Sequence, residues 1–137
     1  MSVAQSWQQC RTAQFSALSS VAGTVITVDG ELDAANSDQL ASYVERNARR
    51  ARRVILDLRE LDFIGTAGFS ALHRINVVCS GAQVNWAMVP SPAVRRLLRV
   101  CDPDGTLPVT TPGAEPLLEP VAWTGARPLL QLVAQAR

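Results

Sequence analysis

A change of hydrophobic period within residues 53–76 constrains this chain more than any other feature. Residues 54–58 form a nearly continuous apolar run, VILDL, which is typical of a strand covered on both faces. After a short loop, apolar residues from Ala71 to Cys79 recur at helical spacing. The Gly-Thr-Ala-Gly stretch at 65–68 separates the two patterns. We therefore expect a central strand followed by a helix that begins at Thr66, where a hydroxyl can cap the first turn.

Patterns on either side of this unit predict further strands and helices. Upstream, residues 11–19 and 24–28 alternate around a Ser- and Gly-containing turn and predict a β-hairpin, which residues 29–33 then interrupt. The other expected elements are a helix capped at 35–37 and reaching Ala48, a strand at 84–89, an amphipathic helix at 93–101, an edge strand at 107–109 and a last helix after Gly125.

This order of elements indicates an α/β fold in one domain over residues 1–137. The connection between the strands at 54–58 and 84–89 contains a helix, so the two strands should be parallel and their following loops should share one rim. The hydrophobic share of 47% is enough for a single core. Residues 1–10 are expected to be a loose segment, and residues 111–137 a Pro-rich stretch with a terminal helix.

Composition narrows the classes of partner. The chain has 13 Arg, no Lys and 12 acidic residues, and a net charge of +1 predicts neither nucleic-acid nor membrane binding. The Arg-rich stretch 49–53 is interpreted as a solvated helix C-terminus. No long apolar run or leader-like segment is found, so a cytoplasmic protein without membrane insertion is expected.

The reactive side chains do not suggest an enzyme. Cys10, Cys79 and Cys101 lack metal-ligand spacing, so reduced thiols and no metal or cofactor are expected. The one histidine, His73, is interpreted as a structural or surface residue. Asp57 and Asp62 have the spacing of a catalytic pair, but loop capping and strand-end hydrogen bonding explain them better.

Two short motifs carry a family resemblance. Gly30-Glu31-Leu32-Asp33 follows a strand and Gly65-Thr66-Ala67-Gly68 opens a helix. In this order and spacing, from about Thr12 to about Val109, the chain resembles the STAS domain of bacterial anti-sigma factor antagonists. The resemblance implies a mixed sheet of about four to five strands flanked by about four helices.

The resemblance also implies a function and a site. The family's phosphorylated hydroxyl falls on Thr66, its next hydroxyl on Ala67 and its glycine on Gly68, whereas its preceding aspartate is replaced by Gly65. The implied partner is an anti-sigma factor with a histidine-kinase-like ATPase fold. Binding through Asp33 and residues 65–68 would release a sigma factor and permit transcription, with phosphorylation of Thr66 as the switch.

Several alternatives stay open at this stage. A STAS subunit of a membrane lipid-transport complex would use the same rim to dock on an ABC-type ATPase. A regulatory disulfide between Cys79 and Cys101 would make an antagonist redox-controlled. Thr66 is otherwise a simple helix cap, and Asp33 is otherwise a cap for the N–H groups of Asn36 or Ser37.

Overall fold

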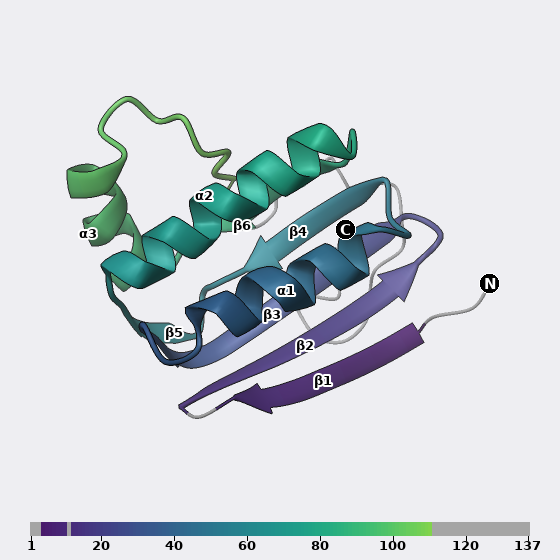
Figure 1. Cartoon of the computed structure of the whole chain (residues 1–137), viewed down its shortest axis with the longest axis horizontal. Helices are drawn as coiled ribbons and strands as arrows, with labels where there is room; N and C mark the ends of the chain where they lie inside the picture. Colours follow the sequence, from purple (N-terminus) through teal and green to yellow (C-terminus); the bar gives the residue numbers. More distant parts are fainter. Residues whose placement is uncertain (1–3, 11, 111–137) are drawn as a thin grey trace.

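The computed structural model describes residues 4–10 and 12–110, which form a mixed β-sheet with helices against one face (Figure 1). The strands are β1 (Ala4–Cys10), β2 (Ala13–Ser20), β3 (Gly23–Leu32), β4 (Arg53–Asp57), β5 (Leu61–Ile64) and β6 (Asn85–Val89). The helices are α1 (Ser37–Ala48), α2 (Thr66–Gly81) and α3 (Pro92–Cys101).

The sheet has the order β1-β2-β3-β4-β6, and the short β5 pairs with the end of β3. The β2–β3 hairpin is antiparallel, and β4 is parallel to both β3 and β6, so the predicted hairpin and parallel pair are confirmed. The expected edge strand at 107–109 is reduced to one parallel bridge between Met88 and Val109. Parallel pairing of β3, β4, β5 and β6 brings their carboxyl ends to one rim.

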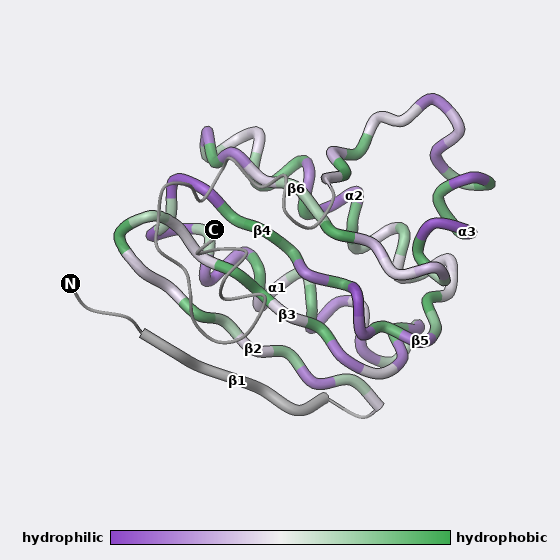
Figure 2. The backbone as a smooth tube through the Cα atoms, turned by 180° about the vertical axis from the view of Figure 1, so that it is seen from behind, coloured by the Kyte–Doolittle hydropathy of each residue, from purple (hydrophilic) through white to green (hydrophobic). Residues whose placement is uncertain are grey.

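The main core lies between the sheet and the helices. Figure 2 shows the sheet from behind, with α1 and α2 on its far side. Phe15 and Tyr43 meet there with ring centroids 5.6 Å apart, and Trp86 is buried while its indole N–H donates to the Asn76 side chain at 3.0 Å. Trp86 therefore belongs to this core.

Three strand assignments from the sequence were wrong. The segment expected to be loose contains β1, which pairs along its whole length with β2, so main-chain hydrogen bonds hold a strand that lacks an apolar alternation. Strand β3 continues through residues 29–32 instead of ending at Val28. Strand β5 was not predicted, because only its first and last residues are buried and the pattern is not alternating.

Gly30 explains why β3 continues through a stretch that looks like a turn. Its φ of +98° is a conformation that other residues rarely adopt, and a Cβ there would lie 2.1 Å from the Thr12 carbonyl oxygen. A register shift between Gly30 and Glu31 bends the strand without ending it. The described residues thus contain six strands and three helices, and the expected fourth helix, after Gly125, lies outside them.

Candidate functional site

The two motifs meet where β3 and β5 end side by side. Leu32, the last residue of β3, pairs with Ile64, the last residue of β5. The N–H of Gly65 donates to the Leu32 carbonyl at 2.9 Å. Asp33 and Thr66, which follow these residues, therefore leave the sheet from neighbouring positions. We call the surface formed by residues 29–33 and 60–68 the β3–β5 rim.

Asp33 organises the turn that leads into α1. Its half-buried carboxylate accepts a hydrogen bond from the N–H of Ala35 at 2.8 Å. The N–H groups of Asn36 and Ser37 instead donate to the main-chain carbonyl of Asp33, at 3.3 and 3.0 Å. The expectation that the Asp33 side chain caps Asn36 or Ser37 was therefore wrong, because the main chain already supplies that acceptor.

Asn36 is a structural residue of the rim that sequence reasoning treated only as a helix cap. Its side chain is fully buried, donates to the Glu31 carbonyl and accepts from the Asp33 N–H, both at 2.9 Å. It thus joins the end of β3 to the turn that follows. No sequence signal distinguishes this role, since asparagine is equally common in turns and caps.

Thr66 is the first residue of α2 and is exposed. The N-cap is Gly65, in an extended conformation, and no side chain caps this helix, so the expectation that the Thr66 hydroxyl caps the first turn was wrong. Among the described residues the hydroxyl has no hydrogen-bond partner. It stands at the positive end of a 16-residue helix, where an added anion would be stabilised.

Gly68 lets α2 approach the sheet directly beneath Thr66. A Cβ at this position would lie 2.4 and 2.9 Å from Cγ1 and Cδ1 of Ile64 and 3.2 Å from Cδ2 of Leu32. A larger residue would therefore have to push aside the side chain of Ile64 and crowd that of Leu32. Ala67 is half-buried beside it.

An exposed aromatic ring, which sequence reasoning missed as a site residue, lies next to Thr66. Phe63 is 50% exposed, and its ring is 3.6 Å from the position that a Cβ of Gly65 would take. Because β5 was not expected, the outward direction of Phe63 was not either. An exposed aromatic side chain gives this part of the rim apolar area that a partner protein can bury.

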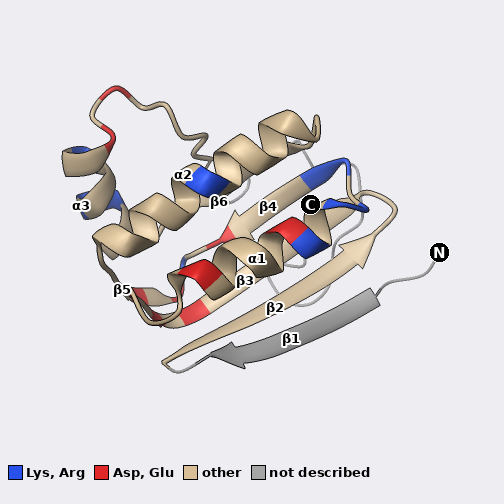
Figure 3. Ribbon diagram, in the orientation of Figure 1, with Lys and Arg blue, Asp and Glu red and all other residues tan. Residues whose placement is uncertain are grey.

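Acidic residues gather at the same end of the sheet. Figure 3 shows them where β3 and β5 end and α1 begins. Burial, and then the nearby carboxylates of Glu60, Asp57 and Asp62, raise the pKa of Asp29 above its ordinary value. The rim therefore carries several carboxylates together with the exposed Phe63.

Asp57 and Asp62 do not form a catalytic pair. Asp57 is buried at the end of β4, where it accepts hydrogen bonds from the backbone N–H of Arg59 at 3.1 Å and from its guanidinium at 3.0 and 3.3 Å. Asp62 is exposed on β5. The interpretation of Asp57 as a strand-end hydrogen-bonding residue is confirmed.

Other reactive side chains lie away from the rim. His73 is exposed on α2, and the described part of the chain contains no group of three or more acidic, His or Cys residues arranged to hold a metal. Within residues 4–10 and 12–110, no helix has both the length and the apolar character that a membrane span requires.

Cys79 and Cys101 are both free thiols. Burial raises the pKa of Cys79 to about 11, which makes its thiolate scarce. Cys79 lies in the last turn of α2, about 20 Å along the helix from Thr66, whereas α3 packs near the β5 end (Figure 1). The two thiols form no disulfide with each other in the structure.

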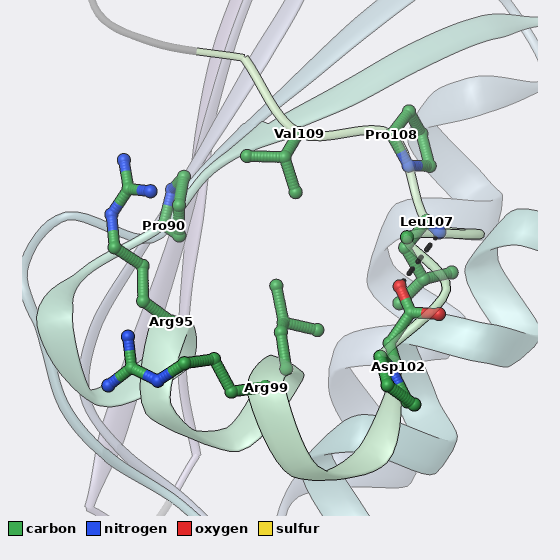
Figure 4. Close-up of a pocket in the computed structure, with 10 residues that line it drawn as sticks. Pro90, Arg95, Arg99, Asp102, Leu107, Pro108 and Val109 are labelled. Carbon is green, nitrogen blue, oxygen red and sulfur yellow. Dashed lines mark hydrogen bonds between the residues drawn. The ribbon is translucent and has the colours of Figure 1, made fainter.

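A groove of 720 Å³ opens between α3 and the loop that follows it (Figure 4). Leu98, Leu107 and Val109 line it, with Arg95 and Arg99 along one side. Hydrogen bonds lower the pKa of Asp102, and the bond from the Thr106 hydroxyl contributes most to this shift. The bonds from Thr106 and from the Leu107 N–H also hold the loop to the end of α3. None of the residues predicted as site residues lines this groove.

The structure is that of an α/β domain. Its predicted site residues Asp33 and Thr66 lie on the β3–β5 rim, at the N-terminus of α2. The chain belongs to the STAS domain family, which it matches over residues 14–111.

The chain is also similar in sequence to an individual protein. The chain is 44% identical over 71 residues to osmosensory protein A of Mycobacterium tuberculosis (strain ATCC 25618 / H37Rv), a match that spans 52% of this chain and 45% of that relative. The chain therefore spans less than half the length of the curated relative that it matches.

Two anti-sigma factor antagonists share the fold. One, from Mycobacterium paratuberculosis, has a TM-score of 0.58 and 20% identity, over 85% of this chain and 92% of that one. The other, SpoIIAA in its unphosphorylated form, has a TM-score of 0.56 and 16% identity, over 79% of this chain and 89% of that one.

Proposed function

We propose that this chain is an anti-sigma factor antagonist: a non-enzymatic binding module that captures an anti-sigma factor and so frees a sigma factor for transcription. The observation that supports this most is the β3–β5 rim, where the Gly65–Leu32 hydrogen bond places the exposed Thr66 beside the Asp33 turn. Membership of the STAS family and the shared fold of two antagonists support it further.

The rim has the physical properties of a binding surface. Phe63 supplies exposed apolar area, and the carboxylates of Asp29, Glu60 and Asp62 favour a partner with a basic rim. Asp33 and residues 65–68 lie at its edge on main chain that the sheet holds rigidly, which reduces the entropy lost on binding.

Phosphorylation of Thr66 would switch this surface. A phosphate at the first residue of α2 adds a charge of about −1.5 to −2 and meets unpaired N–H groups at the positive helix end, so the fold is kept. The same charge and the bulk of the phosphate stand where the small, neutral hydroxyl would contact the partner. Dehydrating the phosphate at that contact costs free energy that the partner's cations, which face the carboxylates of the rim, do not return. Gly65 stands where the family has an aspartate before the acceptor. In this chain Asp62 and Glu60 supply carboxylates nearby.

The proposed partner is an anti-sigma factor with a histidine-kinase-like ATPase fold, because a partner that binds ATP can also phosphorylate Thr66. Both proteins would act in the cytoplasm, where sigma factors function. No direct contact with nucleic acid is needed in this mechanism.

A competition experiment tests the proposal. The chain is added to a preformed complex of the cognate anti-sigma and sigma factors, and free sigma factor is measured by gel filtration. We expect wild type to release sigma factor and the rim variant Phe63→Ser to release much less. A matched surface variant, Val77→Ser, changes a 58% exposed residue farther along α2 and should behave as wild type. Capture of an ABC-type ATPase from lysate, with no sigma factor released, would contradict the proposal.

A further inference from the structure

The groove between α3 and the loop that follows it combines apolar side chains with positive charge (Figure 4). Leu98, Leu107 and Val109 line it together with Arg95 and Arg99, and we call the space between these residues the α3 groove. Val109 is 44% exposed and Leu98 is only half-buried. A ligand in the α3 groove therefore has apolar surface to remove from water.

The positive charge comes from two arginines one helical turn apart. Arg95 and Arg99 are both exposed, and Figure 4 shows their guanidinium groups along the same side of the groove. Like charges at this spacing on a helix repel each other. Within residues 4–10 and 12–110 neither arginine forms a salt bridge. An anion between the two guanidinium groups would relieve the repulsion and accept charge-assisted hydrogen bonds.

Asp102 does not neutralise these arginines. It is the one acidic residue among the described residues that line the groove, and it lies across the groove from both guanidinium groups (Figure 4). Its carboxylate accepts hydrogen bonds from the Thr106 hydroxyl at 2.6 Å, the Thr106 N–H at 2.9 Å and the Leu107 N–H at 3.0 Å. These bonds hold the loop side of the groove in place, so less entropy is lost when a ligand binds.

We propose that the α3 groove binds a small amphipathic carboxylate. The carboxylate would lie between Arg95 and Arg99, and the apolar chain would cover Leu98, Leu107 and Val109. The groove volume of 720 Å³ falls within the range of about 300–1,000 Å³ that is typical of small-ligand sites. An amphipathic helix of a partner protein would need a longer row of apolar pockets, because its anchors recur at every turn.

This inference goes beyond the proposed function and does not depend on it. Among the described residues that line the α3 groove, none belongs to the β3–β5 rim at 29–33 and 60–68. The groove would therefore give the domain a small-molecule site separate from its protein-binding surface.

An NMR titration of the full-length chain tests the proposal. Sodium octanoate is added to ¹⁵N-labelled protein below its micelle concentration, and the amide shifts are followed. We expect the shifts to concentrate in α3 and in the loop at 102–109. Acetate, which lacks the apolar chain, and 1-octanol, which lacks the charge, should each bind about tenfold more weakly, because each loses one of the two interactions.

Variants of α3 separate the charge from the apolar contact. Arg95→Gln combined with Arg99→Gln should weaken octanoate binding about tenfold and leave octanol binding unchanged, since only the carboxylate needs the guanidinium groups. Arg96→Gln is the matched control, because Arg96 is exposed on the same helix and does not line the groove. This control should bind octanoate nearly as wild type does.

Several results would overturn the proposal. These are octanoate shifts centred on Phe63 or elsewhere outside the groove, octanol binding as tight as octanoate binding, and an equal loss of affinity in Arg96→Gln. Absence of any shift with octanoate would also overturn it. If an acidic amphipathic peptide then shifted the same groove residues, the groove would belong to a protein partner instead.

Discussion

The N–H of Gly65 donates to the carbonyl oxygen of Leu32 at 2.9 Å, and this one hydrogen bond joins the two sequence motifs of the chain. Leu32 ends β3 and Gly65 is the N-cap of α2, so Asp33 and Thr66 each follow one of its partners. Main chain, not side chains, sets their relative position. Substitutions of Asp33 or Thr66 should therefore alter the surface while leaving its scaffold intact.

Gly68 should be intolerant of a side chain. Gly68→Ala places a Cβ 2.4 Å from Cγ1 of Ile64, and we expect a loss of about 1–3 kcal/mol in the free energy of unfolding. Gly81→Ala is the matched control, because no atom lies within 4 Å of a Cβ there and alanine favours a helix. Urea denaturation measures both, and equal stabilities would refute the close approach of α2 to β5.

The buried Asp57 should depend on Arg59. Arg59→Ala removes the guanidinium that donates at 3.0 and 3.3 Å and leaves a buried carboxylate short of partners, at a cost of about 1–3 kcal/mol in unfolding free energy. Arg49→Ala breaks only the exposed 4.0 Å pair with Glu45 and should change stability by less than about 0.5 kcal/mol. Thermal unfolding of the two variants gives the comparison, and a similar small change in both would count against the buried pair.

Asp33→Asn separates charge from turn formation. An asparagine oxygen can still accept from the Ala35 N–H, so stability should stay within about 0.5 kcal/mol of wild type. Loss of the carboxylate should weaken binding to the anti-sigma factor about threefold to tenfold. Asp33→Ala loses the turn hydrogen bond as well and should cost about 1 kcal/mol. Unchanged affinity in Asp33→Asn would reduce Asp33 to a turn residue.

Cys79 should resist alkylation in the folded protein. With a pKa of about 11, only about one thiol in a thousand is ionised at pH 8, and the side chain is buried. The half-buried Cys101 should react first, and Cys79 should react only after unfolding. Peptide mapping after iodoacetamide treatment, with and without prior oxidation, follows each thiol. A Cys79–Cys101 disulfide in folded, oxidised protein would restore the redox alternative.

Much of the scaffold follows from the sequence because its signals are periodic. The run at 54–58 and the helical spacing after Thr66 both lie in the structure where expected, and parallel pairing of β4 with β6 follows from the intervening helix. Strand β5 carries no such signal, since its pairing with β3 depends on main chain and not on alternation.

The site was predictable only in part for the same reason. The motifs identify Asp33 and Thr66, but the outward direction of Phe63 depends on β5, and the burial of Asn36 depends on how the Asp33 turn folds back on Glu31. Both are tertiary effects. The capping role expected for Thr66 fails because Gly65 occupies the N-cap position itself.

Titration of the cognate anti-sigma factor with wild type and Thr66→Glu tests the central claim most directly. The account predicts that the glutamate weakens binding about tenfold or more, because it adds charge at the first turn of α2. Thr66→Ala should bind like wild type and cost less than about 0.5 kcal/mol in stability, since the hydroxyl caps nothing. Ser80→Glu, an exposed position in the last turn of α2, controls for added charge elsewhere. Equal dissociation constants for wild type and Thr66→Glu, together with no phosphate on Thr66 after incubation with the anti-sigma factor and ATP, would contradict the account.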